Sequence, residues 1–245
     1  MKAIERRTIR EYTSEPISEK TLKYILSCGQ RASNCGNMQL YSIIVTQTQE
    51  GKQRLAPLHF NQPMVENSAV VLTICVDTNR FNKWCETNNA SKSLNNYLFL
   101  NVATIDAAIC TQAMAQAAEE KGLGVCYLGT VNYMVEDISK ALNLPDGVIP
   151  VTCLTIGYPK QIPPMTERLP LEAVVHYEEY KDYTTANIKA MYKDIENNPT
   201  NQDFVKENNM ENLAQVFTQV RYPKEMNENF SKKYEDYLKE HFFEK

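Results

Sequence analysis

The sequence predicts a mixed α and β domain built in three layers, and three observations lead to this class. Short apolar runs that are typical of buried strands alternate with segments of helical periodicity. Hydrophobic residues make up 43% of the 245 positions and charged residues 23%, as in a globular chain with a sizeable core. No long-range repeat or low-complexity segment interrupts the alternation. The pattern favours an α/β or α+β fold of one large domain with an appendage.

The first predicted elements are a helix and a strand joined by a polar loop. Ser18 can cap the helix, which we expect over residues 19–31 because apolar residues recur there at helical spacing. Residues 33–37 are a cluster of turn formers. They lead into a β-branched run at residues 40–46, which predicts a strand.

A buried strand and a long helix follow. Residues 69–76 form a continuous apolar run bounded by polar residues, as expected of a strand covered on both faces. Residues 94–121 are rich in alanine and free of glycine and proline, which predicts a long central helix that ends at Gly122. Apolar side chains recur along it at helical spacing: Leu98, Val102, Ile105 and Ile109.

The last elements of the predicted core are short. Residues 125–128 suggest a brief strand, and residues 136–142 a short helix that ends before Pro145. Residues 149–156 form a further buried strand, closed by Gly157. No glycine occurs after Gly157, and the charged segment that follows predicts a solvent-rich helical appendage rather than a second core.

Charge and hydropathy argue against several classes of function. The net charge of −4 gives no support for nucleic-acid binding. The longest uncharged stretches fall short of the roughly 18 residues that a membrane-spanning helix needs, so we expect no membrane span. The N-terminus lacks the apolar region of a signal peptide, which predicts a cytoplasmic protein.

The cysteines and histidines give no sign of a metal site or a disulfide framework. There are seven cysteines, none in a C-x-x-C motif, and we interpret them as reduced thiols. The three histidines, His59, His176 and His241, lie far apart and form no metal-binding pair. We therefore expect no metal.

A basic cluster near the N-terminus is the first candidate site. Arg6, Arg7 and Arg10 surround the hydroxyl of Thr8, and guanidinium groups with a nearby hydroxyl suit a phosphate monoester. By itself this pattern is more simply explained as a solvated basic face of a short helix.

A cluster of glycines is the second candidate site. Gly129 follows a predicted strand and would let the backbone approach a flat ligand closely. A helix cap at Gly122 followed by a bulge in the strand explains the pattern equally well. The segment is not a dinucleotide-binding fingerprint, and the motifs of P-loop, serine hydrolase and zinc protease sites are missing from the sequence.

Taken in order, these segments resemble the nitroreductase family of FMN-dependent oxidoreductases, in particular the larger oxygen-insensitive nitroreductases and NADPH-flavin reductases. The resemblance covers essentially the whole chain, and no motif is decisive without the others. The matching motifs are Arg6 to Tyr12 with Glu15 to Ser18, Arg31 to Gln39, Gly122 to Gly129, Leu142 to Pro145, and Ile156 to Pro159 with Arg168 to Pro170.

The resemblance implies a homodimeric α+β fold, a three-layer α/β/α sandwich with a helical C-terminal extension. Residues 1–180 would form the FMN-binding core, and residues 181–245 would pack on the core or on the partner subunit. The helix at residues 94–121 and the tail around Arg221 would be dimer surfaces. An ordinary core helix explains the apolar face of residues 94–121 equally well.

The resemblance also implies a flavin site made of residues from several segments. The arginines and Thr8 would bind the FMN phosphate and ribityl chain, the loop after the first helix and Gln62 would contact the flavin, and residues 127–129 would lie along the ring near N5. The implied cofactor-binding residues are Arg6, Arg7, Thr8, Arg10, Ser33, Asn34, Cys35, Gly36, Gln39, Gln62, Tyr127, Leu128, Gly129 and Arg168. Thr130 and Arg221 would bind substrate.

The sequence departs from the family pattern at two positions. Thr166 stands where the subgroup usually has a lysine directed at the phosphate, a charge that Arg6 would replace. Thr130 stands where a second glycine commonly follows Gly129, and its side chain would narrow the substrate face.

The implied reaction is hydride transfer from NADPH or NADH through flavin N5 to a planar acceptor, such as a nitroaromatic, a quinone or a flavin, by a ping-pong mechanism. No catalytic side chain is then required, because the flavin carries out the redox step. Two alternatives remain: a non-catalytic flavin- or nucleotide-binding protein, and an enzyme that uses Cys126 or Cys35 as a nucleophile. The second alternative lacks a histidine adjacent to either cysteine in the sequence.

Overall fold

The structure is a computed structural model that describes residues 3–243. Its chain divides into two compact units. The first comprises the described parts of residues 1–164 and 231–245, and the second comprises residues 165–230. The boundary at residue 180 stays a prediction.

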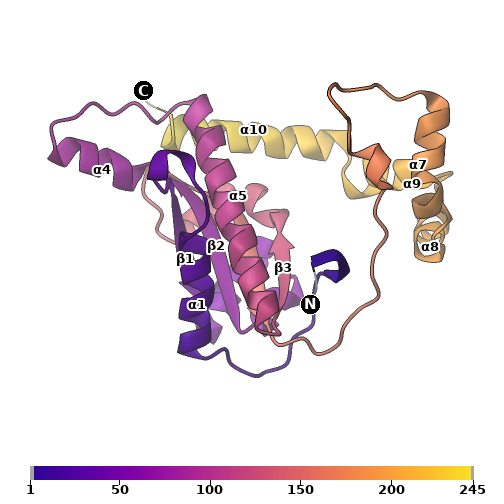
Figure 1. The fold of residues 1–245 in the computed structure, drawn as a ribbon, viewed down its shortest axis with the longest axis horizontal. Coiled ribbons are helices and arrows are strands. Elements are labelled where there is room, and N and C mark those ends of the chain that lie inside the picture. Colours follow the sequence, from indigo (N-terminus) through magenta and orange to yellow (C-terminus); the bar gives the residue numbers. More distant parts are fainter. Residues whose placement is uncertain (1–2, 244–245) are drawn as a thin grey trace. The chain divides into compact units, whose positions relative to one another are not determined.

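The first unit is built on an antiparallel sheet of four strands in the order β1-β2-β4-β3 (Figure 1). The strands are β1 Tyr41–Thr46, β2 Val70–Asp77, β3 Gly124–Leu128 and β4 Val148–Gly157. Strand β2 is buried along its whole length, as its unbroken apolar run predicts. Strands β1 and β3 form the two edges of the sheet.

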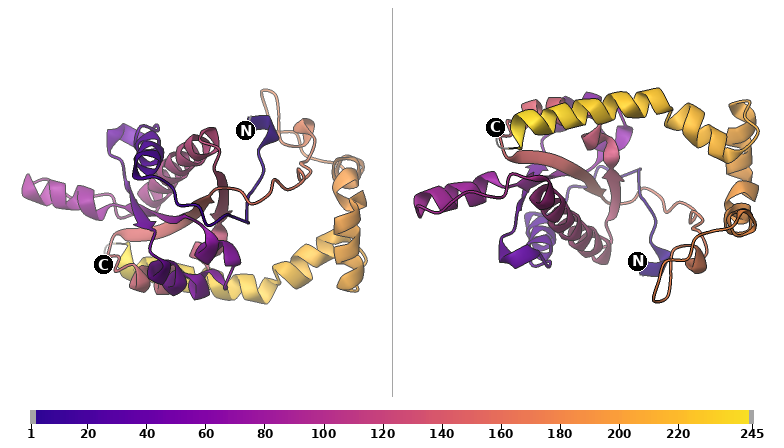
Figure 2. Two further views of the ribbon diagram at one scale, coloured as in Figure 1. Left: turned by 90° about the horizontal axis from the view of Figure 1, so that it is seen from below. Right: turned by 90° about the horizontal axis from the view of Figure 1, so that it is seen from above.

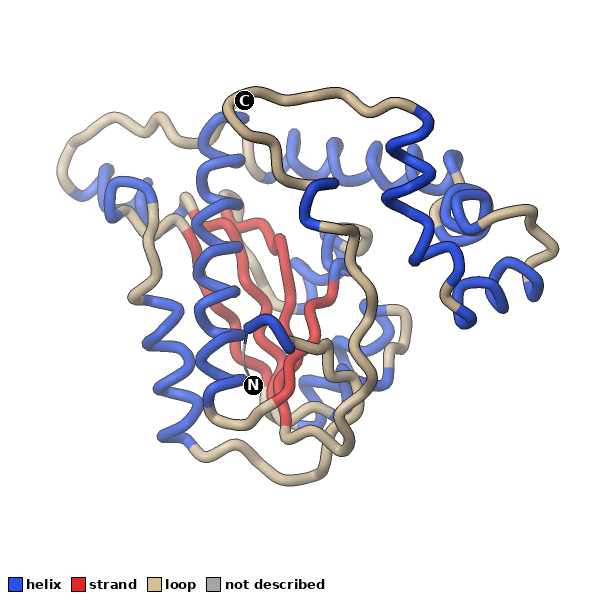
Figure 3. Tube along the Cα trace, turned by 45° about the vertical axis from the view of Figure 1, so that its right-hand side comes forward, coloured by secondary structure: helices blue, strands red, loops and turns tan. Residues whose placement is uncertain are grey.

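Two helices cover one face of the sheet, α1 Glu19–Gln30 and α5 Tyr97–Glu120 (Figures 1 and 3). Ser18 caps α1 by accepting a hydrogen bond from the backbone amide of Thr21 at 3.1 Å. Alternate residues of β2, among them Leu72, point into the core between the sheet and these helices.

Shorter elements pack on the opposite face. Val71, the neighbour of Leu72 on β2, is buried there with Leu55 and Val65. The two faces of β2 therefore contribute side chains to two separate hydrophobic clusters. The elements are α2 Gln49–Leu55, η3 Ala56–His59, α3 Pro63–Asn67, η4 Gly129–Asn132 and α6 Val135–Ala141. Together with the sheet and the α1/α5 layer they complete a three-layer sandwich.

The chain returns to the first unit at its C-terminal end. Helix α10, Lys224–His241, brings Leu238 and then Phe242 into a cluster with Val76 and Ile149. Figure 2 shows the C-terminal part of α10 running on the side of the sheet opposite α1 and α5, and just beyond its end Phe243 packs against Tyr97 at the start of α5, with ring centres 4.2 Å apart. Helix α4, Asn79–Thr87, follows β2 directly.

The second unit is helical. Its elements are the 3₁₀ turn η5 Leu171–Ala173, α7 Thr185–Asn197, α8 Pro199–Glu207, α9 Leu213–Gln215, the π-helical η6 Val216–Arg221 and the first residues of α10. Thr184 and Asn187 form a reciprocal capping box at the start of α7. The guanidinium group of Arg221 lies over the rings of Phe204 and Phe217, at 4.7 and 5.1 Å from their centroids.

Helix α5 buries a different face from the one that its large apolar residues define. Small residues such as Ala107 face the core, with Met114. Leu98, Ile105 and Ile109 are instead 67, 50 and 40% exposed. By length and composition α5 would also suit a membrane span, but its face of small residues packs on the sheet as in the core helix of a globular domain.

Candidate functional site

The N-terminal segment that carries the arginines is fixed along the edge strand β3. The backbone amide of Ile9 donates to the carbonyl of Val125 at 3.0 Å. Further along, the hydroxyl of Tyr12 lies 2.8 Å from the carbonyl of Ile9 and 2.9 Å from Oγ1 of Thr155. These contacts hold the backbone between Arg6 and Tyr12 in an extended path beside the sheet.

Arg6 is paired inside the protein. Its Nε lies 3.0 Å from Oε1 of Glu119, which is only 8% exposed, and its guanidinium carbon lies 5.8 Å from the centre of the Tyr127 ring. Burial raises the pKa of the Glu119 carboxyl, and the charge of Arg6 opposes that rise. Because a carboxylate already balances Arg6, its charge is less available to a phosphate group.

Arg7, Thr8 and Arg10 are better placed to meet an anion. Thr8 and Arg10 line a small cavity of about 90 Å³. Arg7 donates from Nη1 to the carbonyl of Glu5 at 2.6 Å, while its buried Nε has no hydrogen-bond partner among the described residues. An orphaned buried guanidinium donor suits a phosphate oxygen.

Cys126 lies beneath this cluster and is almost completely buried. Burial raises the pKa of its thiol, and the nearby Arg10 and Arg6 limit the rise. Since the thiolate is the reactive form of cysteine, a buried thiol with a raised pKa is a poor nucleophile.

The end of β3 presents an open surface. Tyr127 is 36% exposed and donates from its hydroxyl to Oε1 of Gln112 at 3.0 Å. Burial of its ring raises the pKa of the Tyr127 hydroxyl to about 12. A β-carbon on Gly129 would meet no atom within 4 Å, so the backbone there is open to a flat ligand.

His59 joins this surface to a second segment, and sequence reasoning missed it. Its Nδ1 lies 2.6 Å from Oγ1 of Thr130, and its carbonyl accepts from the backbone amide of Gln62 at 3.2 Å. The side chain has no exposed surface, and burial lowers its pKa to about 4. A lone histidine that meets a residue far along the chain leaves no motif by which it could have been found.

The loop over residues 33–39 is arranged around α5. The backbone amide of Cys35 donates to Oδ1 of Asp106 at 2.9 Å, and that of Gln39 donates to Oδ1 of Asn34 at 3.1 Å. Gly36 has a φ of 57°, a left-handed conformation that glycine adopts at little cost. Burial raises the pKa of the Asp106 carboxyl, and the hydrogen bond from Cys35 counteracts it.

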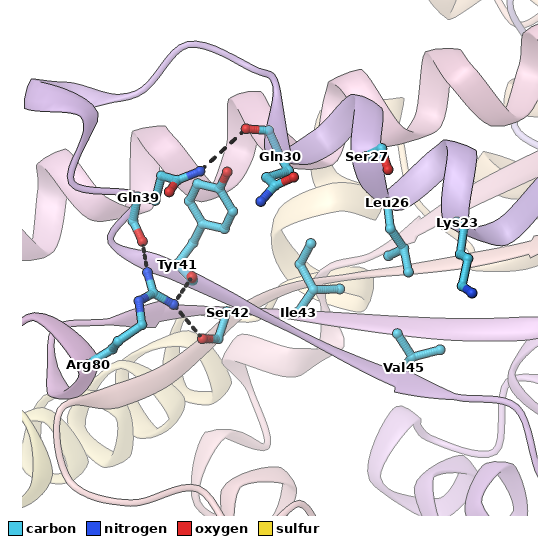
Figure 4. A pocket seen from close by; sticks show the side chains of 10 residues that line it. All are labelled: Lys23, Leu26, Ser27, Gln30, Gln39, Tyr41, Ser42, Ile43, Val45 and Arg80. Carbon is cyan, nitrogen blue, oxygen red and sulfur yellow. Dashed lines mark hydrogen bonds between the residues drawn. The ribbon is translucent and has the colours of Figure 1, made fainter.

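A cavity of about 420 Å³ lies beside this loop, between α1 and β1 (Figure 4). Arg80 donates to the carbonyl oxygens of Gln39 and Tyr41, the latter at 3.2 Å, and so ties the end of the loop to the start of β1. The cavity is lined by Lys23, Leu26, Ser27, Gln30, Gln39, Tyr41, Ser42, Ile43, Val45 and Arg80.

The structure brings some of the predicted residues together and separates others. The arginine segment, Gln62 and residues 127–130 gather around β3, while the loop over residues 33–39 runs directly into β1. The strand order places these two groups at opposite edges of the sheet. Three interstrand spacings amount to roughly 14 Å, so the two groups do not adjoin one another within one chain.

Arg168 and Arg221 belong to the second unit. Arg168 donates from Nη1 to Oγ1 of Thr166 at 2.7 Å and to the carbonyl of Glu167 at 3.0 Å. Thr166, the position where a lysine was expected, thus orients the neighbouring arginine. Within residues 3–243, no cluster of three or more His, Cys, Asp or Glu side chains is arranged to hold a metal ion.

Comparison with known proteins identifies close relatives. The family model described as "Nitroreductase family" matches residues 3–158. An "FMN reductase (NADPH)" from Bacillus subtilis is 34% identical over 176 residues, which are 71% of each chain. A solved structure from Bacteroides fragilis superposes with a TM-score of 0.96 at 43% identity, covering 98% of both chains. The NfrA1 nitroreductase of B. subtilis superposes with a TM-score of 0.85 at 28% identity, covering 98% of this chain and 96% of that one.

Proposed function

The chain belongs to the nitroreductase family, and on that basis we propose that it is an FMN-dependent oxidoreductase that passes a hydride from NADPH or NADH to a small planar acceptor. Relatives of similar length are named as an FMN reductase that uses NADPH and as a nitroreductase. Nitroaromatics, quinones and free flavins are acceptors of the proposed kind.

One observation carries the proposal: an anion-binding segment and an open backbone surface lie side by side along β3. The orphaned Nε of Arg7 and the cavity at Arg10 supply positive donors for a phosphate group. The bare backbone of Gly129 lets a ring system approach closely. The residues present therefore fit FMN.

Each group of residues has a distinct task in this proposal. Arg7, Thr8 and Arg10 hold the phosphate and ribityl chain. Residues 127–129 and Gln62 contact the ring. When bound, FMN supplies the redox chemistry by accepting and returning a hydride. The protein side chains bind and orient the ligands and exclude water, and the buried Cys126 thiol, whose pKa burial raises, is not required as a nucleophile.

The arrangement of the two sheet edges supports a homodimer. The candidate loop over residues 33–39 and the arginine segment lie at opposite edges of one sheet, so a second copy would bring the missing group to each site. The exposed side chains of Leu98, Ile105 and Ile109 on α5 offer an apolar surface to that copy.

The thiols support a reducing compartment. All seven cysteines lie in the described part of the chain and are free, as is usual for a protein of the cytoplasm. We place the protein there.

A spectrum of the purified protein tests the proposed function. We expect a yellow protein with about one FMN per chain, and bleaching when NADPH is added under nitrogen, because the hydride then stays on the flavin. A yellow protein that NADPH does not bleach would be a flavin-binding protein without this activity. A colourless protein that binds no added FMN would contradict the cofactor assignment, and loss of NADPH oxidation in Cys126→Ser with FMN still bound would favour the cysteine enzyme.

Steady-state kinetics test the order of the reaction. If nicotinamide and acceptor use the same open face in turn, the first product must leave before the second substrate binds, and double-reciprocal plots are parallel. Intersecting plots would show that both substrates bind at the same time, at separate places.

A further inference from the structure

His59 couples two segments that the proposed function assigns to the site. Its ring contacts Thr130 at 2.6 Å, and its carbonyl holds the amide of Gln62. Thr130 stands directly after the open backbone of Gly129 and is half-buried. The buried imidazole of His59 is therefore connected to the candidate ligand surface by its hydrogen bond to the Thr130 hydroxyl.

The protonation pattern of the imidazole follows from its surroundings. Nε2 of His59 is buried and has no hydrogen-bond partner among residues 3–243. A neutral imidazole carries one N–H, either at Nδ1 or at Nε2. An N–H at Nε2 would be an orphaned buried donor, whereas a bare Nε2 acceptor is less unfavourable. The tautomer with hydrogen on Nδ1 is favoured, and it donates to Oγ1 of Thr130.

This tautomer fixes the role of the threonine hydroxyl. With one lone pair of Oγ1 occupied by His59, the hydroxyl hydrogen of Thr130 is left to donate elsewhere. The backbone carbonyl of Thr130 already accepts from the amides of Tyr133 at 3.0 Å and Met134 at 3.2 Å. No protein acceptor for the Oγ1 hydrogen occurs among the described residues, so in this half-buried position the hydrogen is available to a bound ligand that replaces solvent.

We propose that His59 is a positioning residue that holds the Thr130 hydroxyl as a hydrogen-bond donor toward an oxygen atom of the electron acceptor. The assignment rests on the proposed function. It makes nitro compounds and quinones, which carry an oxygen at the ring edge, preferred over planar acceptors without one. Because burial lowers the pKa of His59 to about 4, the ring stays neutral and the orientation holds at neutral pH.

The backbone around His59 keeps the ring in place. Phe60 and Asn61 have φ values of 56° and 52°, left-handed conformations that non-glycine residues adopt at a cost. Phe60 also makes an edge contact with Tyr133, with ring centres 6.4 Å apart, between η3 and η4. The segment with His59 and the segment with Thr130 are thus held together by a second contact.

Selectivity among acceptors tests the proposal. The probes are a nitrobenzene derivative, a benzoquinone and N-methylphenazinium, a planar acceptor that carries no oxygen. We expect His59→Leu and Thr130→Val each to lower kcat/KM for the first two, relative to N-methylphenazinium, by about tenfold, mainly through KM. The double variant should be no worse than Thr130→Val, because His59 acts through Thr130. His59→Asn can keep a donor near the position of Nδ1. It should therefore retain most of the wild-type preference, in kcat/KM, for the nitrobenzene and the benzoquinone over N-methylphenazinium.

A second readout needs neither FMN nor turnover. Nitrogen NMR of the three histidines in the FMN-free chain, with His59→Asn to assign its signals, should show His59 with hydrogen on Nδ1. Hydrogen on Nε2 of His59 would overturn the proposal. So would losses of kcat/KM that add up in the double variant, or a His59→Leu variant that keeps the wild-type preference for the oxygen-bearing acceptors. If the wild-type chain binds FMN and oxidises NADPH while these ratios do not change, the proposed function stands and only the assignment of His59 fails. If the wild-type chain oxidises no NADPH, both fail.

Discussion

Ile9 occupies the place that a side chain on Gly124 would need. A β-carbon built on Gly124 would lie 2.5 Å from both Cβ and Cγ1 of Ile9, well inside van der Waals contact. This close approach lets the amide of Ile9 bond to the carbonyl of Val125 at 3.0 Å. The position of the arginine segment along β3 therefore depends on the absence of one methyl group.

Two glycine substitutions should separate this structural role from ligand binding. Gly124→Ala should lower the free energy of unfolding by about 1–3 kcal/mol and weaken FMN binding, because Ile9 must move. Gly129→Ala, whose β-carbon would meet no protein atom within 4 Å, should change stability by less than about 0.5 kcal/mol yet also weaken FMN binding. Urea unfolding and a flavin fluorescence titration measure both quantities. Equal destabilisation by the two variants would contradict the open surface at Gly129.

Arg10→Ala should weaken FMN binding without unfolding the protein. Loss of one charge-assisted contact to phosphate costs about 1.5–3 kcal/mol, a tenfold to hundredfold loss of affinity. Arg54→Ala, at an exposed arginine on α2, is the matched control and should bind FMN like the wild type. Cys126→Ser should weaken FMN binding less than Arg10→Ala does. If Arg10→Ala and Arg54→Ala bind equally well, the phosphate lies elsewhere.

His59 should make the protein less stable in acid. The pKa of the His59 imidazole is about 4 in the folded protein and 6.5 in the unfolded chain. Between pH 6.5 and pH 4 the unfolded chain therefore binds a proton that the folded protein does not bind. Stability that is fully present above pH 6.5 is thus lost as the pH falls toward 4, by about 3 kcal/mol from this group.

Urea unfolding between pH 7 and pH 4 measures that loss. His59→Asn should be less stable at neutral pH but should lose less stability on acidification. His176→Asn is the matched control and should keep the wild-type dependence. A wild-type pH slope in His59→Asn would mean that other groups cause the acid sensitivity.

Ile105→Glu should dissociate the proposed homodimer. Ile105 is 50% exposed on α5 between Leu98 and Ile109, and a carboxylate buried in an apolar interface is strongly unfavourable. Light scattering across micromolar concentrations should show dimers for the wild type and monomers for the variant, with weaker FMN binding. Gln53→Glu adds the same charge at an exposed position on α2 and should remain dimeric. A wild-type monomer that binds FMN fully would contradict the shared site.

Most of the core could be predicted from the sequence, because its elements have strong local patterns. The buried strand predicted at residues 69–76 is β2, Val70–Asp77, and the helix predicted at residues 94–121 is α5, Tyr97–Glu120. The three-layer α+β fold and the membership of the nitroreductase family are confirmed. Period and capping determine such elements locally, so a single sequence is sufficient to locate them.

Features that depend on distant contacts could not be predicted. The large apolar residues of α5 suited a core face and a dimer surface equally well, whereas in the structure alanines pack on the sheet and Ile105 is left exposed. The pairing of Arg6 with Glu119 and the contact of His59 with Thr130 join residues far apart in the chain. Neither pair has a characteristic spacing, so only the folded chain shows that one arginine of the cluster is balanced and that a histidine lies behind the candidate site.

The return of the chain to its first unit determines how a cleaved protein would behave. Residues 165–230 are flanked on both sides by segments of the first unit. In that first unit, Leu238 and Phe242 are buried in a cluster with Val76 and Ile149. Backbone bonds reinforce this attachment, since the carbonyl of His241 accepts from the amide of Gly147 at 2.7 Å. A single protease cut within residues 165–230 would therefore leave two fragments that elute together in gel filtration and part only in denaturant. Separately expressed halves would be able to reconstitute one particle when mixed.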